Sequence, residues 1–206
     1  LGGRVGGGPR TCRVALFGLL NGPPGRLTAR GRPVRRRSPN RATHPDLGLA
    51  LVPEDRKTEG LILDMSIADN LNLAVYGERR LGLLGVGDPS ERRLADLIER
   101  MGLVYRDLRD PVSSLSGGNQ QKVVLSKWLA TRPKCLLLLD PTRGIDVKAK
   151  AQIYALLRSL SEEGMAIVFQ STDHEELIHL CDRVHVFYNG RVNKVLESGD
   201  ITAESL

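Results

Sequence analysis

A serine followed by two glycines opens a helical pattern at 116–121, and an apolar run further along, at 136–140, ends in an acid. Backbone N–H groups and the positive dipole end at the start of a helix favour an anion. An apolar strand that ends in an acid can deliver a carboxylate to a site for metal ion and phosphate. Together, the two segments predict a domain that binds a phosphate-bearing ligand.

Strand and helix patterns alternate along the chain, most regularly after residue 134. Such alternation predicts an α/β fold with a largely parallel sheet and crossover helices. The expected strands are 47–52, 135–139, 166–170, 184–187 and 192–196, with a hairpin turn at 188–191. The expected helices are 66–73, 90–101, 117–130, 146–161 and 173–181, a loop is expected at 77–89, and 14–20 fits a helix or a strand.

The composition gives no sign of a membrane-spanning or secreted protein. No apolar run approaches the ~20 residues that cross a bilayer, and no secretory signal is visible. The chain starts at Leu1, so we expect more sequence upstream. Three cysteines (Cys12, Cys135 and Cys181) have no metal-ligand spacing, which fits a reducing, cytosolic setting.

The first fifty residues carry most of the positive charge. They hold ten arginines and one acid, a charge of +9 within a net charge of +6. Such a region could bind nucleic acid, yet no aromatic residue interrupts Arg35–Arg36–Arg37 for base stacking. We therefore expect a solvated basic loop and no nucleic-acid partner.

The two segments of the opening paragraph resemble the signature loop and Walker B strand of ATP-binding cassette (ABC) transporter ATPases. The resemblance is closest to the second ATP-binding half of bacterial import ATPases for simple sugars of the ribose, galactose and xylose type. Those domains combine Leu-Ser-Gly-Gly-Asn-Gln-Gln-Lys, here 115–122, with Pro-Thr-Arg-Gly-Ile-Asp, here 141–146. The segment 52–57, Val-Pro-Glu-Asp-Arg-Lys, also matches. The resemblance extends well from 48 to 196 and weakly before.

The resemblance implies a P-loop NTPase-type fold with a mainly parallel sheet, flanking helices and a helical signature subdomain. Residues 1–47 would be a degenerate or truncated phosphate-loop region, and 48–206 the ABC ATPase domain. Within that domain, 54–132 would be the helical subdomain and 133–206 the RecA-like part.

In this family the signature loop acts in trans and closes over a γ-phosphate held by a second nucleotide-binding domain. The residues that would do so here are Ser116, Gly117, Gly118, Asn119 and Gln120. Asp146 matches the loop that contacts the partner domain, and it also fits a helix N-cap. Glu54 lies where relatives place the Q-loop, which senses nucleotide and touches the membrane subunit.

The family's Walker B strand ends in Asp-Glu, where the Asp orients Mg²⁺ through water and the Glu polarises the attacking water. An ungapped alignment places Leu139 at the Asp position and Asp140 at the Glu position. A one-residue deletion instead makes Asp140 the metal-site acid and leaves no Glu. Either way one carboxylate is missing, so Asp140 is a degenerate catalytic and metal residue and hydrolysis should be weak.

The phosphate loop is also degenerate. Gly3, Gly6 and Gly8 lie within the glycine frame of the motif, but Pro9 and Arg10 follow where a basic residue and a hydroxyl are expected. Proline lacks the N–H that would cradle phosphate. One inserted residue would restore the pair Arg10 and Thr11.

The switch segment follows the strand at 166–170. Most relatives have a His there that contacts the γ-phosphate, whereas this chain has Thr172. His174 lies two residues further on, where we expect it to face solvent in the first turn of a helix. Second domains of sugar importers usually lack the His too.

The resemblance therefore implies an ATP-binding subunit of a sugar importer that uses ATP and Mg²⁺ and whose own hydrolytic site is weak or inactive. Its partners would be a second ABC nucleotide-binding domain, permease subunits and, indirectly, a periplasmic sugar-binding protein, at the cytoplasmic face of the membrane. Two alternatives stay open: a non-catalytic regulatory or dimerisation remnant, and a nucleic-acid-associated ABC ATPase. The sequence does not identify the sugar.

Overall fold

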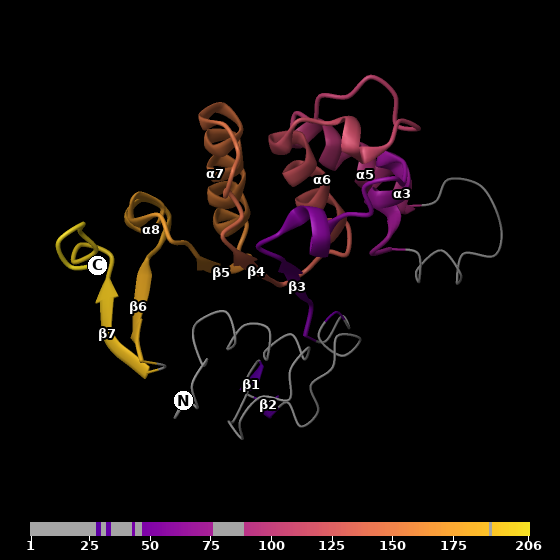
Figure 1. The fold of residues 1–206 in the computed structure, drawn as a ribbon. Coiled ribbons are helices and arrows are strands. Elements are labelled where there is room, and N and C mark those ends of the chain that lie inside the picture. Colours follow the sequence, from indigo (N-terminus) through magenta and orange to yellow (C-terminus); the bar gives the residue numbers. More distant parts are fainter. Residues whose placement is uncertain (1–27, 30–31, 34–42, 44–46, 76–88, 190) are drawn as a thin grey trace.

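The computed structural model describes residues 28–29, 32–33, 43, 47–75, 89–189 and 191–206 (Figure 1). The segments expected at 14–20 and 77–88 lie outside these residues. In the described part of the chain, no helix has the length and apolarity that a bilayer crossing requires.

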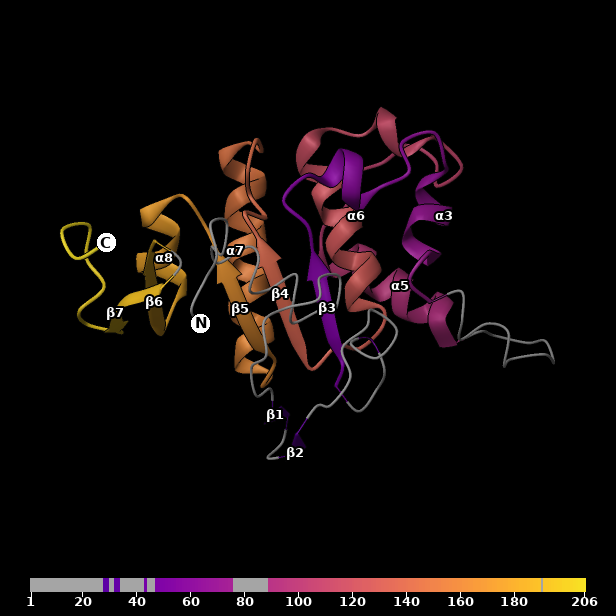
Figure 2. The ribbon, with the colours of Figure 1, turned by 60° about the horizontal axis from the view of Figure 1, so that its bottom comes forward.

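Three parallel strands form the centre of the fold. They are β3 (Leu49–Val52), β4 (Cys135–Leu139) and β5 (Ala166–Gln170), in that order across the sheet (Figure 2). Because the strands are parallel, their carboxyl ends meet at one edge. The predicted α/β fold with a parallel sheet is confirmed, and the bounds of β4 and β5 are those expected from the sequence.

The last two strands do not pair with this sheet. β6 (Arg183–Tyr188) and β7 (Arg191–Glu197) form a separate antiparallel hairpin, and β1 (Thr28–Ala29) pairs with β2 (Arg32–Pro33). Asn189 adopts a φ of 46°, a left-handed conformation that asparagine tolerates in tight turns. The hairpin expected at 188–191 is confirmed through the pairing of Tyr188 with Arg191.

Polar side chains at their N-caps define where several helices begin. Ser66, Ser116, Asp146 and Asp173 each accept a backbone N–H from the first turn of the helix that follows. These helices are α3 (Ile67–Asn72), α6 (Gly117–Leu129), α7 (Val147–Glu162) and α8 (His174–Leu180), and α5 is Pro89–Arg100. A π-helical turn, η1 (Arg56–Gly60), and a 3₁₀ turn, η2 (Val112–Ser114), complete the set.

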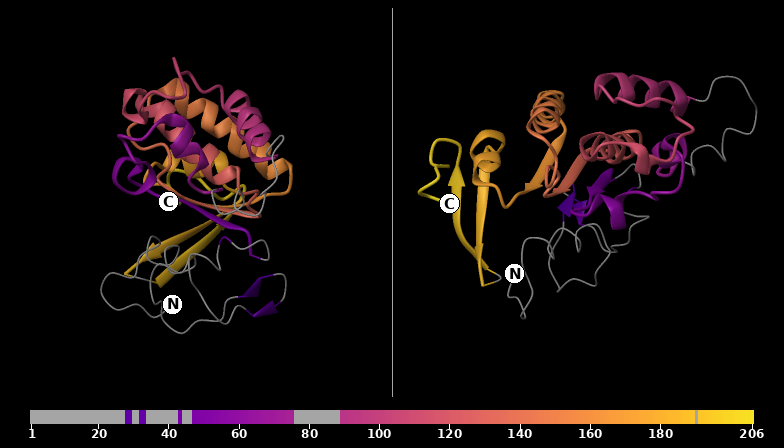
Figure 3. Two further views of the ribbon diagram at one scale, coloured as in Figure 1. Left: turned by 90° about the vertical axis from the view of Figure 1, so that its right-hand side faces the viewer. Right: turned by 45° about the horizontal axis from the view of Figure 1, so that its top comes forward.

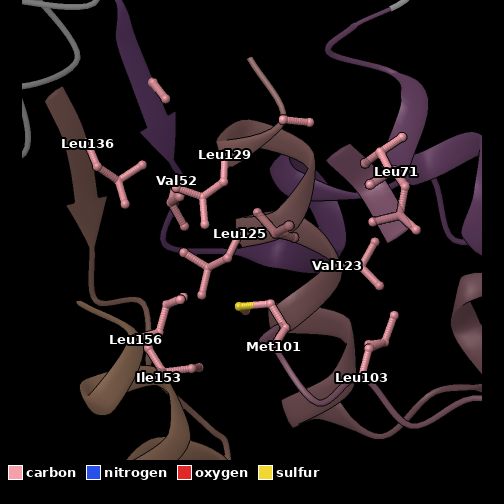
Figure 4. Close-up of a cluster of buried hydrophobic side chains, with 14 of the residues drawn as sticks. Val52, Leu71, Met101, Leu103, Val123, Leu125, Leu129, Leu136, Ile153 and Leu156 are labelled. Carbon is pink, nitrogen blue, oxygen red and sulfur yellow. The ribbon is translucent and has the colours of Figure 1, made fainter. Parts of the chain in front are cut away.

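Helices α6 and α7 lie on one face of the sheet (Figures 2 and 3). Between them and the strands lies the main apolar core, which Figure 4 shows. In this core, β3 and β4 meet the two helices through a set of fully buried or nearly buried side chains, Val52, Leu125, Leu129, Leu136, Ile153 and Leu156. Leu51, Leu137 and Leu139 point to the opposite face and form a second cluster. The alternation follows the two-residue period of a strand and buries both faces of β4.

Candidate functional site

The start of α6 presents Ser116 to solvent. Its hydroxyl oxygen accepts hydrogen bonds from the Asn119 backbone N–H at 3.4 Å and from Asn119 Nδ2 at 3.1 Å. A capped helix start keeps the first-turn N–H groups and the positive end of the helix in a fixed orientation. Ser116 therefore lies where the predicted in-trans role needs it, at an exposed helix N-terminus.

The two amides after the glycines hold the loop that leads into α6. Asn119 Oδ1 accepts the backbone N–H of Val104 at 3.1 Å. Gln120 is buried, and its Nε2 donates to the carbonyl of Leu115 at 3.1 Å. The Gln120 side chain thus points into the protein, where its observed contacts are structural, and its predicted contact with nucleotide stays a prediction.

The two glycines of the signature make room for neighbouring side chains. A Cβ on Gly117 would lie 2.6 Å from Arg56 Nη2, and a Cβ on Gly118 would lie 2.5 Å from the Cβ of Ala149. Real Cβ atoms do not approach other atoms so closely. Both glycines are predicted to let phosphate approach, and within this chain they also leave space for the side chains of Arg56 and Ala149.

Replacing Gly118 with Ala should destabilise the fold by about 1–3 kcal/mol, because the new methyl group overlaps Ala149 at the packed starts of α6 and α7. The matched control is Gly199→Ala, where a Cβ meets nothing within 4 Å. That change should stay within about 1 kcal/mol. Urea unfolding measures both, and equal midpoints would contradict the packing role.

Asp146 lies beside the signature. Its Oδ1 accepts the Ala149 backbone N–H at 2.9 Å, which caps α7, and its Oδ2 is 3.4 Å from the position a Cβ on Gly118 would take. Both Ser116 and Asp146 are exposed. The N-termini of α6 and α7 therefore form one surface that carries the predicted signature and the predicted dimer-contact residue.

Glu54 joins the same region from the end of β3. Its carboxylate forms an ion pair with Arg143, in the turn between β4 and α7. Arg56 reaches the same turn and donates from Nη1 to the carbonyl of Arg143 at 2.9 Å and from Nη2 to that of Gly144 at 3.3 Å. The predicted Q-loop position is thus linked directly to the turn that carries Asp146, the predicted dimer-contact residue.

Asp140 and Thr172, predicted separately, are hydrogen-bonded to each other. Asp140 Oδ1 accepts the Thr172 backbone N–H at 2.8 Å and its hydroxyl at 3.2 Å. Asp140 is buried and has a φ of 40°, a region that non-glycine residues rarely adopt and that clusters at functional sites. This strand-end pair occupies the edge where the parallel strands finish.

The side chain of Leu139 does not join the pair of Asp140 and Thr172. It is 2% exposed and packs in the apolar cluster with Leu51 and Leu137. Asp140 is therefore the acid that the strand delivers to the site. In the described residues, no group of three or more His, Cys, Asp or Glu side chains could hold a metal ion.

The remaining predicted residues are placed as follows. His174 is exposed at the first position of α8, as expected. Gly3, Gly6, Gly8, Arg10 and Thr11 lie outside the described residues.

A buried carboxylate, Glu176, links both strand ends and was not predicted. It is 2% exposed and accepts hydrogen bonds from Ser171 at 2.6 Å, from Tyr154 at 2.7 Å and from Thr142. Lys150 lies 2.8 Å from Glu176 and 2.6 Å from Asp173. We call Glu176, Thr142, Ser171, Lys150 and Tyr154 the Glu176 cluster. It fastens the turn after Asp140 to the residue before Thr172.

The contacts within the Glu176 cluster shift the pKa values of its ionisable side chains. Burial raises the pKa of Glu176, but the hydrogen bonds from Lys150, Ser171, Thr142 and Tyr154 outweigh it and the net pKa is lowered. Burial lowers the pKa of Lys150, and its carboxylate partners reverse that change and raise it. Burial and the bond to Glu176 raise the pKa of Tyr154 to about 12. The ionised carboxylate and the ammonium group stabilise each other at neutral pH.

The sequence analysis did not assign Glu176 or Arg56 to the site. The sequence carried a usable signal for Glu176 and only a weak one for Arg56. Glu176 is four residues before Leu180 on one face of α8, so a charge at a core-facing position was a usable signal. Arg56 had a weaker signal, membership in the matching segment 52–57, because its partners lie 87 and 88 residues away.

Comparison with known proteins agrees with this geometry. The ABC transporter family model matches residues 1–143. A ribose import ATP-binding protein of Rhizobium johnstonii is 47% identical over 208 residues, which are 100% of this chain and 40% of that protein. One of Streptomyces avermitilis is 42% identical over 207 residues, again 100% of this chain and 40% of that protein.

Solved structures show the same architecture. CbiO1 of Clostridium perfringens, part of an ABC transporter complex, is 25% identical with a TM-score of 0.75, covering 98% of this chain and 77% of its own. A dimeric ATP-binding cassette bound to ADP and Pi is 22% identical with a TM-score of 0.76, covering 95% and 82%, and supports the fold alone.

The parallel sheet, the capped helix starts beside it and these neighbours define the class as an ATP-binding cassette ATPase fold. The family match spans more than half of the chain, and the chain therefore belongs to the ABC transporter family. The predicted resemblance is confirmed, and the family match includes the first 47 residues, where the sequence indicated only a weak resemblance. The chain spans about 40% of the length of the curated relatives it matches.

Proposed function

We propose that this chain is the second ATP-binding domain, or part of it, of an ABC importer for simple sugars. In that role it would couple ATP binding and hydrolysis to transport. The support comes from relatives named as ribose import ATP-binding proteins, at 47% and 42% identity across this whole chain. Within it, 1–47 would be the phosphate-loop region, 54–132 the signature subdomain and 133–206 the RecA-like part.

The in-trans role rests on one observation, the exposed, capped start of α6 beside Asp146. Helix N-termini bind phosphate through backbone N–H groups and the dipole, so this surface fits a triphosphate. Ser116, Gly117 and Asn119 would bind and orient the γ-phosphate of ATP held by a partner domain, and Asp146 would contact that domain. ATP supplies the phosphoanhydride bond whose hydrolysis drives transport.

The chain's own nucleotide site is a weak one in this proposal. Asp140 Oδ1 already accepts two hydrogen bonds from Thr172, and Leu139 is buried among leucines. In the part of the chain that the structure describes, these residues do not form a set of Mg²⁺ ligands. Asp140 would therefore not hold Mg²⁺ for hydrolysis at this strand end.

This chain alone should bind Mg·ATP weakly, with a Kd above about 1 mM, a free energy of about −4 kcal/mol or less favourable. The reason is that the damaged strand end offers one carboxylate, which Thr172 already engages. Isothermal titration of the chain with Mg·ATP measures this, and ADP and Mg²⁺ alone are the controls. Saturable, Mg²⁺-dependent binding below about 10 µM would refute the weak site.

The proposed assembly contains a competent nucleotide-binding domain, permease subunits and, indirectly, a periplasmic sugar-binding protein, at the cytoplasmic face of the membrane. Closure of the two nucleotide-binding domains would shift the permease between two states. The decisive experiment is the ATP turnover of the paired domains after a negative charge is placed at Ser116. Unchanged turnover would end the proposal.

A further inference from the structure

Three segments that are distant in sequence meet at the guanidinium group of Arg56. Its two terminal nitrogens donate to the carbonyls of Arg143 and Gly144, at 2.9 Å and 3.3 Å. Nη2 also lies 2.6 Å from the point that a Cβ on Gly117 would occupy. One side chain of η1 therefore contacts the turn at 141–146 and lies beside the first glycine of α6.

The geometry of this contact, with two donors on two adjacent carbonyls, favours arginine. A planar guanidinium can donate to two neighbouring acceptors at once, whereas a lysine ammonium has no such fork. Gly144 has a φ of 66°, a left-handed conformation that glycine adopts without strain, and it belongs to the turn that offers both carbonyls. The absence of a side chain at Gly117 leaves space for the guanidinium.

Charge pairing contributes little to the position of Arg56, since its described attraction to an acid, the neighbouring Asp55, is weak. The guanidinium lies beside the N-terminus of α6, whose helix dipole has the same sign. Its Nε is buried and has no hydrogen-bond partner among the described residues. A buried donor without a partner costs stability, so the arrangement has a cost that the two carbonyl contacts must offset.

We propose that Arg56 is a positioning residue, which holds the 141–146 turn against the start of α6. Ser116 and Asp146 then face a partner domain as one surface with fixed geometry. This inference rests on the proposed function and deepens it, because it names the residue that aligns the two parts of the in-trans surface. Arg56 acts through the turn and through Gly117.

Substitutions at Arg56, made in the intact ATPase assembly that contains this chain and its partner domain, test the proposal. Arg56→Gln should lower kcat for ATP about tenfold, because small misplacements in a site have large effects on rate. The KM for ATP should stay within about twofold, since the partner domain holds the nucleotide. Arg56→Lys should recover part of the loss through a single hydrogen bond.

Arg183→Gln is the matched control. It removes an exposed ion pair with Glu197 in the β6–β7 hairpin. Because surface ion pairs contribute little, its kcat should stay within about twofold of the original.

Unchanged kcat in Arg56→Gln would overturn the positioning role, and so would a fall in kcat that parallels a loss of folded protein in urea unfolding. Turnover that survives Ser116→Asp would defeat the proposed function itself. Turnover lost in Ser116→Asp but retained in Arg56→Gln would defeat only the role of Arg56.

Discussion

Replacing Ser116 with Asp should lower ATP turnover of the paired nucleotide-binding domains by about 100-fold. In the proposed function the exposed Ser116 hydroxyl approaches the γ-phosphate of a nucleotide held by the partner. A carboxylate at this position would face the negative charge of that phosphate. Like charges brought together at an interface cost several kcal/mol, and about 3 kcal/mol corresponds to about 100-fold in rate.

Asp at this position should not disturb the fold. Aspartate caps helices as well as serine does, and a negative charge at a helix N-terminus is favourable. The control is Ser116→Asn, which has a similar shape and also caps the helix but carries no charge. Turnover of the Asn variant should stay within about tenfold of the original, so that the difference between the two variants isolates the charge.

Steady-state ATPase assays of the assembly measure both variants, and urea unfolding verifies that both are folded. Equal turnover of the Asp variant and the original protein would contradict the in-trans role. An equal loss in the Asp and Asn variants would contradict the charge argument, because the serine hydroxyl and not the phosphate charge would then determine turnover.

Replacing Glu176 with Ala should destabilise the fold by about 3 kcal/mol. The substitution removes the acceptor for Thr142, Ser171 and Tyr154 and one of the two carboxylates beside Lys150. Breaking a buried ion pair on one side typically costs about 3–5 kcal/mol, and Asp173 still compensates part of the Lys150 charge. For a domain of this size the melting temperature should fall by about 6–12 °C.

Glu175→Ala is the control for this prediction. Glu175 is the neighbouring residue on α8, and its side chain is 75% exposed beside His179. Loss of an exposed pair has little effect on stability. Thermal unfolding followed by circular dichroism measures both variants, and equal melting temperatures would show that the Glu176 cluster contributes nothing.

The pH dependence of stability provides a second measurement of Glu176. Its folded-state pKa is lowered from 4.5, so its contribution is fully present at pH values above 4.5. The contribution is lost as the pH falls through the lowered pKa, because the unfolded state then binds the proton more readily. Between neutral and acid pH, the free energy of unfolding should therefore fall less in Glu176→Gln than in the original protein.

The strands and helices were predictable where local rules decide them. The leucine run of β4 and the apolar run of β5 have their expected bounds, since apolar runs between turn signals identify strands. The helix starts at Ser66, Ser116 and Asp146 were within one residue because N-caps are encoded by single side chains.

The site was predictable in part. The resemblance indicated Ser116, Asp140, Asp146 and Thr172, and the structure brings Asp140 to Thr172 and Asp146 to the signature glycines. The contacts of Arg56 and of the Glu176 cluster depend on how distant segments pack, which residue spacing does not encode. Similarly, the packing of Gly118 on Ala149 depends on the separation between two helices.

The burial of Leu139 in a cluster with Leu51 and Leu137 has an evolutionary consequence. An aspartate at this position would lose its hydration inside an apolar layer, and unpaired buried charges are strongly disfavoured. On the ungapped alignment, in which residue 139 takes the family's Asp position, a single Leu139→Asp substitution would therefore weaken the fold. Under that alignment Leu51 and Leu137 would have to change before an acid at residue 139 could be tolerated.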